Sequence, residues 1–252
     1  MVIIYHKVPG VDSAFGHKKD ELIKGKLREF YTRLFDAFGR QRWWPGETPF
    51  EVAVGAVLTQ NTNWGNVEKA IRNLKEANAL CSLAMDRMSN ERLAELVRPS
   101  GYFNIKALRL KALVSFIVSG YQGNILRMRD TETAVLREKL LAINGIGPET
   151  ADSILLYALE KPVFVVDAYT KRILARHEII SGETDYSHVQ ELFHKSLAPD
   201  VKLYNEYHAL IVKAGKTFCR PRAPLCGSCP LSDDGPGKNG NGKPSAAEKR
   251  AR

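Results

Sequence analysis

The stretch LLAINGIGPETAD, residues 140–152, decides how this sequence is interpreted. It reads as the apolar end of one helix, a Gly-Ile-Gly turn, and a second helix that Pro148 opens. Gly145 and Gly147 permit a positive φ and a close backbone approach, and proline suits the first turn of a helix. We expect Ile146 to plug the turn. Residues 140–155 are therefore predicted to form two helices joined by a tight hairpin, although a plain helix–helix turn would leave the same pattern.

This hairpin is also a candidate contact for nucleic acid. Backbone N–H groups at such a turn, together with the dipole of the second helix, attract an anion such as a DNA phosphate. The candidate contact residues are Asn144, Gly145, Ile146 and Gly147. The chain has 37 Lys and Arg against 28 Asp and Glu, a net charge of +9. A basic balance favours polyanionic partners through phosphate neutralisation.

Helical periodicity dominates the rest of the chain, and alternating strand patterns are nearly absent. An apolar helical segment around Phe30 is expected to end at Gly39, Thr48 to cap a helix through Gln60, and another helix to begin near Trp64. Further helices are predicted over about 90–97, 104–120, 131–142, 168–178, 186–197 and 201–215. The short apolar run at 163–166 is expected to be a connector, so the predicted fold is all-α.

Composition also limits where the protein works. No apolar run is long enough for a signal peptide or a membrane span, so we expect a cytoplasmic protein without a membrane partner. Apart from two prolines, residues 233–252 contain no apolar residue larger than alanine. Such a segment buries too little surface to offset its ordering entropy. It is predicted to be a disordered, mildly basic tail.

Asp167 follows the hairpin after one helix and the corner KPVFVV, residues 161–166. Hairpin, helix, corner and aspartate together resemble the helix-hairpin-helix superfamily of DNA glycosylases, over about residues 45–230. The segments LTQNT at 58–62 and GYFNIKA at 101–107 also match the family. The resemblance implies two helical domains: a six-helix barrel at 46–160 with the hairpin at 140–155, and a terminal domain from both chain ends. The terminal domain takes residues 1–45 and 161–232, ahead of the tail at 233–252.

The same resemblance implies a monomeric enzyme that flips a damaged base out of double-stranded DNA and hydrolyses its glycosidic bond. Asp167 is the expected catalytic carboxylate, which stabilises an oxocarbenium-like sugar or positions the attacking water. A role as a helix N-cap would also explain this aspartate. Gln60 resembles the family glutamine that helps to fill the gap left by the flipped base.

Glu149 bears on the type of glycosylase. Bifunctional members of the endonuclease III type carry a lysine two residues after the second hairpin glycine, where this chain has Glu149. A carboxylate cannot form a Schiff base with the sugar, so the resemblance implies a monofunctional enzyme without AP-lyase activity. Glu149 is the second catalytic candidate, although the helix dipole alone also favours a carboxylate in a first turn.

The three tryptophans of the chain, Trp43, Trp44 and Trp64, are candidates for the substrate pocket. Flat electron-rich rings attract an N-alkylated, cationic purine by stacking and cation–π contact. With Glu149 they resemble the 3-methyladenine DNA glycosylase branch, which implies alkylated purines as substrates. The glycosidic bond of such a base is already weak, so the enzyme needs little protonation of the leaving group. This agrees with the lack of an obvious catalytic histidine. Any of these tryptophans could instead pack the domain junction. Lys216 stands where that branch has a pocket lysine, but a phosphate contact or a solvated side chain fits it as well.

Cys219, Cys226 and Cys229 have the spacing of the first three ligands in the family's four-cysteine iron–sulfur loop. The fourth would fall near residue 235, which is glycine here. Three possibilities stay open: a [4Fe–4S] cluster with an aspartate at 233 or 234 or water on the fourth iron, a zinc site with another ligand, or a relic without metal. The expected chemistry needs no cofactor. Cys81 lies elsewhere and is expected to be a small buried residue.

Two other functions are compatible with these motifs. An endonuclease III-type glycosylase would act on oxidised or mismatched bases, and a lyase would nick the strand without alkali. A non-enzymatic DNA-binding module would use the hairpin only to hold phosphates and would release no base.

Overall fold

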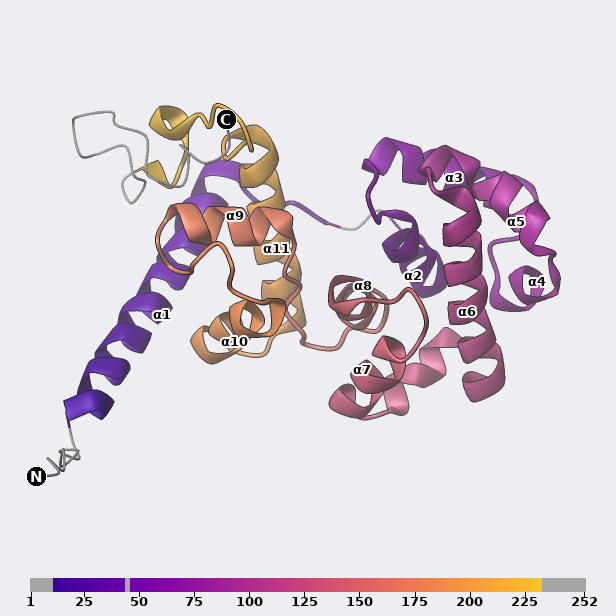
Figure 1. Cartoon of the computed structure of the whole chain (residues 1–252), viewed down its shortest axis with the longest axis horizontal. Coiled ribbons are helices and arrows are strands. Elements are labelled where there is room, and N and C mark those ends of the chain that lie inside the picture. The colour runs from indigo at the N-terminus through magenta and orange to yellow at the C-terminus, as the bar shows by residue number, and fades with distance from the viewer. Residues whose placement is uncertain (1–10, 44–45, 233–252) are drawn as a thin grey trace, which may run out of the picture. The chain divides into compact units, whose positions relative to one another are not determined.

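Two groups of helices make up the fold, described by a computed structural model over residues 11–43 and 46–232 (Figure 1). Unit 1 comprises Met1–Gln41, Val166–Ala198 and Tyr207–Arg252. Unit 2 comprises Arg42–Val165 and Pro199–Glu206. Both ends of the chain thus contribute to unit 1. The predicted tail at 233–252 lies outside the described residues.

Most described residues of unit 1 lie in four helices: α1 (Val11–Phe38), α9 (Ala168–Arg176), α10 (Tyr186–Ser196) and all but the first turns of α11 (Val201–Thr217). In α1, Leu27, Phe30 and Leu34 are almost completely buried, because their spacing of three and four residues puts them on one face. α10 packs against α1. The guanidinium Nε of Arg28 donates to the Ser196 carbonyl at 3.2 Å.

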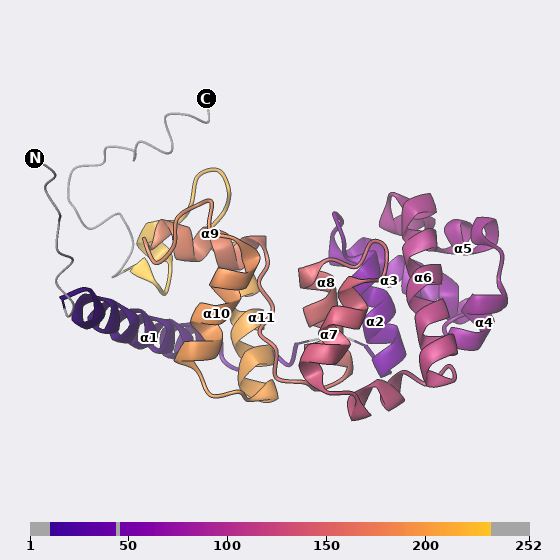
Figure 2. The same cartoon turned by 60° about the horizontal axis from the view of Figure 1, so that its bottom comes forward.

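Unit 2 contains α2 (Pro49–Leu58), α3 (Trp64–Glu76), α4 (Ser82–Arg87), α5 (Asn90–Val97), α6 (Phe103–Tyr121), α7 (Thr133–Leu141) and α8 (Pro148–Ser153), with the 3-10 turns η1 (Arg98–Ser100) and η2 (Ile125–Asp130). Residues 50–58 of α2 are all buried, as expected for a helix that is apolar on every side. α6 packs against both α4 and α5 (Figure 2). The core of this unit therefore surrounds α2.

Helix ends follow the capping residues of the sequence. The Gly39 N–H donates to the Phe35 carbonyl at 2.7 Å, and Gly39 has φ +62°. This confirms the predicted end of α1, because glycine tolerates the left-handed conformation. The Thr48 side chain accepts from the Glu51 N–H at 3.1 Å, which confirms the predicted cap of α2.

The C-terminal end of α2 is held by a buried lysine. Lys106 of α6 is 1% exposed, and its Nζ donates to the carbonyls of Leu58 and Ser100 at 2.8 and 2.6 Å. Burial first, and then the nearby charge of Arg109, lower the pKa of Lys106 to about 8. The lysine of the GYFNIKA motif thus fixes the chain just before Gln60.

An ion pair joins the two hairpin helices. Arg137 of α7 donates through Nε and Nη2 to both carboxylate oxygens of Asp152 in α8, at 2.7 and 3.0 Å. The Asp152 side chain is completely buried, and two-point binding by arginine offsets the cost of burying its charge. After Ser153 the helix continues as a single π-helical segment, η3 (Ile154–Ala158).

One expectation about a cysteine was wrong. Cys81 is exposed, because it is the N-cap of α4, where its Sγ accepts from the Ala84 N–H at 3.4 Å. The apolar run at 163–166 is a connector as predicted, and the described part of the chain contains no strand. Within the same residues no helix is long and apolar enough to span a membrane.

Candidate active site and hairpin

Of the two hairpin glycines, only Gly145 has the predicted positive φ, because Gly147 is extended with φ −89°. Gly145 has φ +85°, and a Cβ there would lie 2.3 Å from Cγ of Arg109, so only glycine fits. Ile146 is 4% exposed and belongs to the core of unit 2. Its N–H donates to the Ile143 carbonyl at 3.0 Å, so this group is used by the turn itself. Gly147 is the N-cap of α8.

Gln60 is bound to the hairpin. Its Nε2 donates to the Gly145 carbonyl at 3.1 Å and to the Thr150 hydroxyl at 2.8 Å, and Arg109 donates to its Oε1. The sequence interpretation did not include Arg109 or Thr150. A spacing of 85 residues between Gln60 and Gly145 gives no local signal for this contact. Gln60 and the hairpin therefore form one connected polar group in unit 2.

Trp64 lines a cavity of about 320 Å³ in unit 2. Its indole Nε1 donates to Glu68 at 2.9 Å, one turn further along α3. Lys75 forms ion pairs with Glu47 and Glu51 at 3.0 Å each on the wall of the same cavity. The cavity therefore presents an aromatic ring beside charged side chains of both signs, which include Arg72 and Lys75.

The other pocket candidates are placed as follows. Trp43 is half-buried at the start of unit 2, and Trp44 lies outside the described residues. Glu149 is exposed in the first turn of α8 in unit 2. Lys216 is exposed near the end of α11 in unit 1.

Asp167 lies in unit 1 as the N-cap of α9. Its Oδ1 accepts from the Thr170 N–H at 2.7 Å and from the Thr170 hydroxyl at 2.9 Å. Its Oδ2 lies 3.6 Å from Nε2 of His208, and the aspartate side chain is 11% exposed. The capping role considered in the sequence interpretation is therefore present, and it uses one of the two oxygens.

The charge state of Asp167 follows from opposing effects. Burial disfavours the charged carboxylate and acts to raise the pKa of Asp167. The nearby His208 and the donors of Thr170 outweigh burial, so the pKa lies below its ordinary value. A buried carboxylate whose pKa is shifted by specific partners is a candidate for a functional site. Asp167 is thus a buried, preorganised anion.

The sequence interpretation also missed His208. It is 5% exposed on α11, and 41 positions separate it from Asp167, so no motif joins the two. The sequence showed no obvious catalytic histidine. The structure places the imidazole of His208 beside the candidate catalytic carboxylate.

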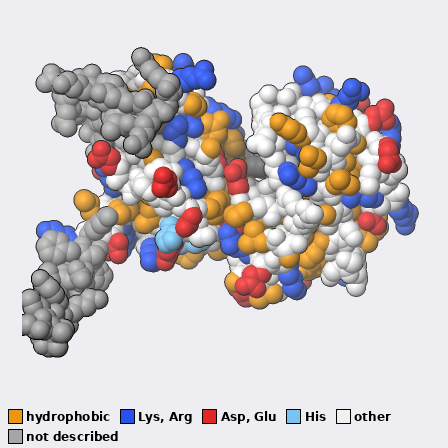
Figure 3. All heavy atoms as spheres, in the orientation of Figure 1, with side chains coloured by type: hydrophobic (Ala, Val, Ile, Leu, Met, Phe, Trp, Pro, Cys, Tyr) orange, Lys and Arg blue, Asp and Glu red, His pale blue; other side chains and the backbone are white. Residues whose placement is uncertain are grey.

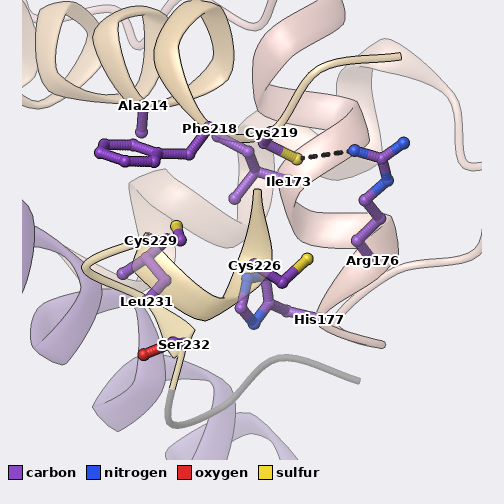
Figure 4. A pocket seen from close by; sticks show the side chains of 10 residues that line it. All are labelled: Ile173, Arg176, His177, Ala214, Phe218, Cys219, Cys226, Cys229, Leu231 and Ser232. Atoms are coloured by element: carbon purple, nitrogen blue, oxygen red, sulfur yellow. Dashed lines mark hydrogen bonds between the residues drawn. The ribbon is translucent and has the colours of Figure 1, made fainter. Parts of the chain in front are cut away.

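Three cysteines of unit 1 lie in the segment 219–229, which we call the thiol loop. Cys219, Cys226 and Cys229 line one small pocket (Figure 4). Arg176 Nη1 donates to the Cys219 Sγ at 3.2 Å. Burial first, and then the neighbouring thiols, raise the pKa of Cys229. No group of three His, Cys, Asp or Glu side chains in the described ranges is arranged to hold a metal ion.

Arginines hold this loop by its backbone. Arg172 donates to the carbonyls of Cys219 and Gly215 at 2.7 and 3.3 Å. Arg176 donates to the carbonyls of Arg220 and Pro221 at 2.7 and 3.0 Å. With three cysteines and a guanidinium on one thiol, the described donor set does not fit the four-cysteine iron–sulfur site. The aspartates at 233 and 234 lie outside the described residues.

A model of the HhH-GPD superfamily of base excision DNA repair proteins matches residues 54–199. This match covers more than half of the chain and includes the hairpin and Asp167. The chain therefore belongs to the HhH-GPD superfamily of DNA glycosylases, and it is endonuclease III-like.

The more particular likeness is to the 3-methyladenine branch. A Methanocaldococcus jannaschii protein with the provisional name of a DNA repair glycosylase is 50% identical over 82% of this chain and 94% of its own length. The H. pylori 3-methyladenine DNA glycosylase, solved with 1,N6-ethenoadenine bound, has a TM-score of 0.62 at 32% identity, covering 79% of this chain and 97% of that one. An endonuclease III–DNA complex has a TM-score of 0.73 at 20% identity over 84% and 95% of the two chains, which shows the shared fold.

Proposed function

We propose that this protein is a monofunctional DNA N-glycosylase that removes alkylated purines such as 3-methyladenine from double-stranded DNA. The observation that carries the proposal is Asp167: a buried carboxylate, held in its ionised form, at the position that the family resemblance assigns to catalysis. As the glycosidic bond breaks, positive charge develops on the sugar. A fixed anion stabilises that transition state more than the ground state.

Two features support an alkylated base as the substrate. Trp64 lines a cavity of unit 2, and its indole is bound to Glu68 on the same wall. An electron-rich aromatic face favours a planar cation over a neutral base. The likeness to a 3-methyladenine glycosylase at 32% identity points the same way. An alkylated purine is also a good leaving group, so the chemistry requires little acid assistance.

Glu149 supports a glycosylase without lyase activity. A lyase needs an amine that attacks C1′ of the sugar, and here the residue two positions after the second hairpin glycine is a carboxylate. The proposed reaction ends with an abasic site and an unbroken strand. Water and a carboxylate suffice for it, so no metal or cofactor is assigned to the chemistry.

We expect DNA to be held through the hairpin segment 144–147 and through Lys and Arg contacts with phosphates. On the face shown in Figure 3, Lys and Arg side chains are scattered over the surface and mixed with Asp and Glu. The net charge of +9 supports a polyanionic partner. The basic side chains on this face do not form one continuous patch.

The test is a panel of duplexes that each contain one lesion: an alkylated purine, an oxidised pyrimidine, uracil, or an adenine mismatch. We expect base release from the alkylated purine only, with strand breaks that appear only after alkali. Release of oxidised or mismatched bases, or nicking without alkali, would support the endonuclease III-type alternative. Tight binding without any base release would support the DNA-binding module.

A further inference from the structure

The two oxygens of Asp167 have different partners. Oδ1 accepts both bonds from Thr170 and so caps α9. Oδ2 faces Nε2 of His208 on α11 at 3.6 Å, and both side chains are nearly buried, at 11% and 7% exposed. Helix capping therefore explains the contacts of Oδ1. It does not explain why Oδ2 faces the buried imidazole of His208. All three residues belong to unit 1.

We propose that His208 is a positioning residue, which directs an Nε2–H at Oδ2 of Asp167 and so keeps that carboxylate oriented for base release. The inference rests on the proposed function, in which Asp167 stabilises the developing sugar cation. A carboxylate that is capped through Oδ1 alone can still rotate about its χ2. A donor on the second oxygen fixes the plane of the group and satisfies an acceptor that would otherwise be costly to bury.

The distance of 3.6 Å is longer than a hydrogen bond of 2.7–3.2 Å. Catalytic hydrogen bonds are often long in the absence of substrate and shorten in the reacting complex. We therefore expect the His208 contact to act in the transition state more than in the resting protein. If His208 only fills space in the core, a side chain of similar volume without a donor should support the same rate of base release. If His208 positions Asp167, the donor at Nε2 is required.

Three variants separate the two explanations. His208→Gln keeps an N–H donor near the position of Nε2, His208→Met keeps a similar volume without a donor, and His208→Asn has a donor that is too short to reach Oδ2. Each is assayed as the full chain by single-turnover release from a duplex with one alkylated purine. Affinity for a duplex with a stable abasic analogue is measured by fluorescence anisotropy, and folding by circular dichroism.

We expect His208→Met and His208→Asn each to release the base at least tenfold more slowly than the parent, with affinity for the abasic duplex within twofold. His208→Gln should recover most of the rate. In an Asp167→Asn background, His208→Met should cause no further loss, because the group that it positions is gone.

A rate within twofold of the parent for folded His208→Met, or for His208→Asn if the Met variant is unfolded, would overturn the inference. So would equal losses in the Gln and Met variants. If Asp167→Asn itself keeps the parental rate, the proposed function fails instead. If Asp167→Asn is inactive but the His208 variants are fast, only the positioning role is rejected.

Discussion

In the proposed function, Asp167 has two roles, one for each carboxylate oxygen. Oδ1 caps α9 through its bonds from Thr170, and Oδ2, which faces His208, is the oxygen that we assign to the chemistry. Asparagine caps helices about as well as aspartate. The substitution Asp167→Asn should therefore remove the negative charge and still leave the N-terminus of α9 capped.

The lowered pKa of Asp167 predicts how stability depends on pH. The folded state favours the charged carboxylate, so its contribution is fully present above the unfolded pKa, about 3.8, and is lost as the pH falls through the lower folded value. We expect the parent to lose stability relative to Asp167→Asn only below about pH 4. Urea unfolding of both proteins from pH 7 to pH 3 measures this. A parental advantage that increases as the pH falls would contradict the lowered pKa.

Trp64 lines the cavity of unit 2, and the proposed function makes it a candidate to stack on a base. We expect Trp64→Ala to weaken base release by about 1–3 kcal/mol, the usual contribution of base–aromatic stacking. Trp64→Phe is the matched control, because it keeps an aromatic face and removes the indole Nε1 that donates to Glu68. Single-turnover rates on a duplex with an alkylated purine decide the case. If Ala variants of Trp43, Trp44 and Trp64 all keep the parental rate, the base pocket lies elsewhere.

At the scale of elements, the α7–α8 hairpin depends on one glycine. Gly145→Ala forces alanine to adopt φ +85° and places a Cβ against Arg109, so we expect a loss of about 1–3 kcal/mol in unfolding free energy. Gly120→Ala is the control, because it lies in α6 with nothing within 4 Å of the added Cβ. That change should stabilise the protein by about 0.5–1 kcal/mol. Similar effects of both substitutions would contradict the strained hairpin.

The thiol loop gives a second prediction for an element. Because arginine–carbonyl bonds hold the loop and its described donor set does not fit a cluster, we expect Cys226→Ala to leave the melting temperature nearly unchanged. Arg172→Met should lower it, since it removes both bonds to the end of α11. Elemental analysis after anaerobic purification should find no stoichiometric iron. Yellow-brown protein with stoichiometric iron would contradict this view of the loop.

Local signals explain which elements could be predicted. Thr48, Gly39 and the Gly-Ile-Gly turn determine their own backbone through side-chain caps or a positive φ, so those boundaries follow from sequence. Cys81 was misjudged because thiols are usually buried, whereas here the side chain caps an exposed helix. The contacts from Gln60 to Gly145 and from Asp167 to His208 bridge distant segments, and only the folded chain brings them together.

At the scale of the whole molecule, the two candidate groups fall in different units. Asp167 and His208 belong to unit 1, and the hairpin, Gln60 and Trp64 belong to unit 2. The proposed reaction requires both, because the duplex must be held and the base must leave. We therefore expect mutations to separate binding through phosphates from chemistry at the sugar.

The measurement that tests the central claim most directly is base release by Asp167→Asn beside the parent protein. Methylated duplex DNA is incubated with each, released bases are separated by chromatography, and binding is followed by fluorescence anisotropy. We predict that the parent releases 3-methyladenine, and that the Asn variant binds equally well but releases it on the order of a hundredfold more slowly or less. An Asn variant within a few-fold of the parental rate would remove Asp167 from catalysis and contradict the proposed mechanism.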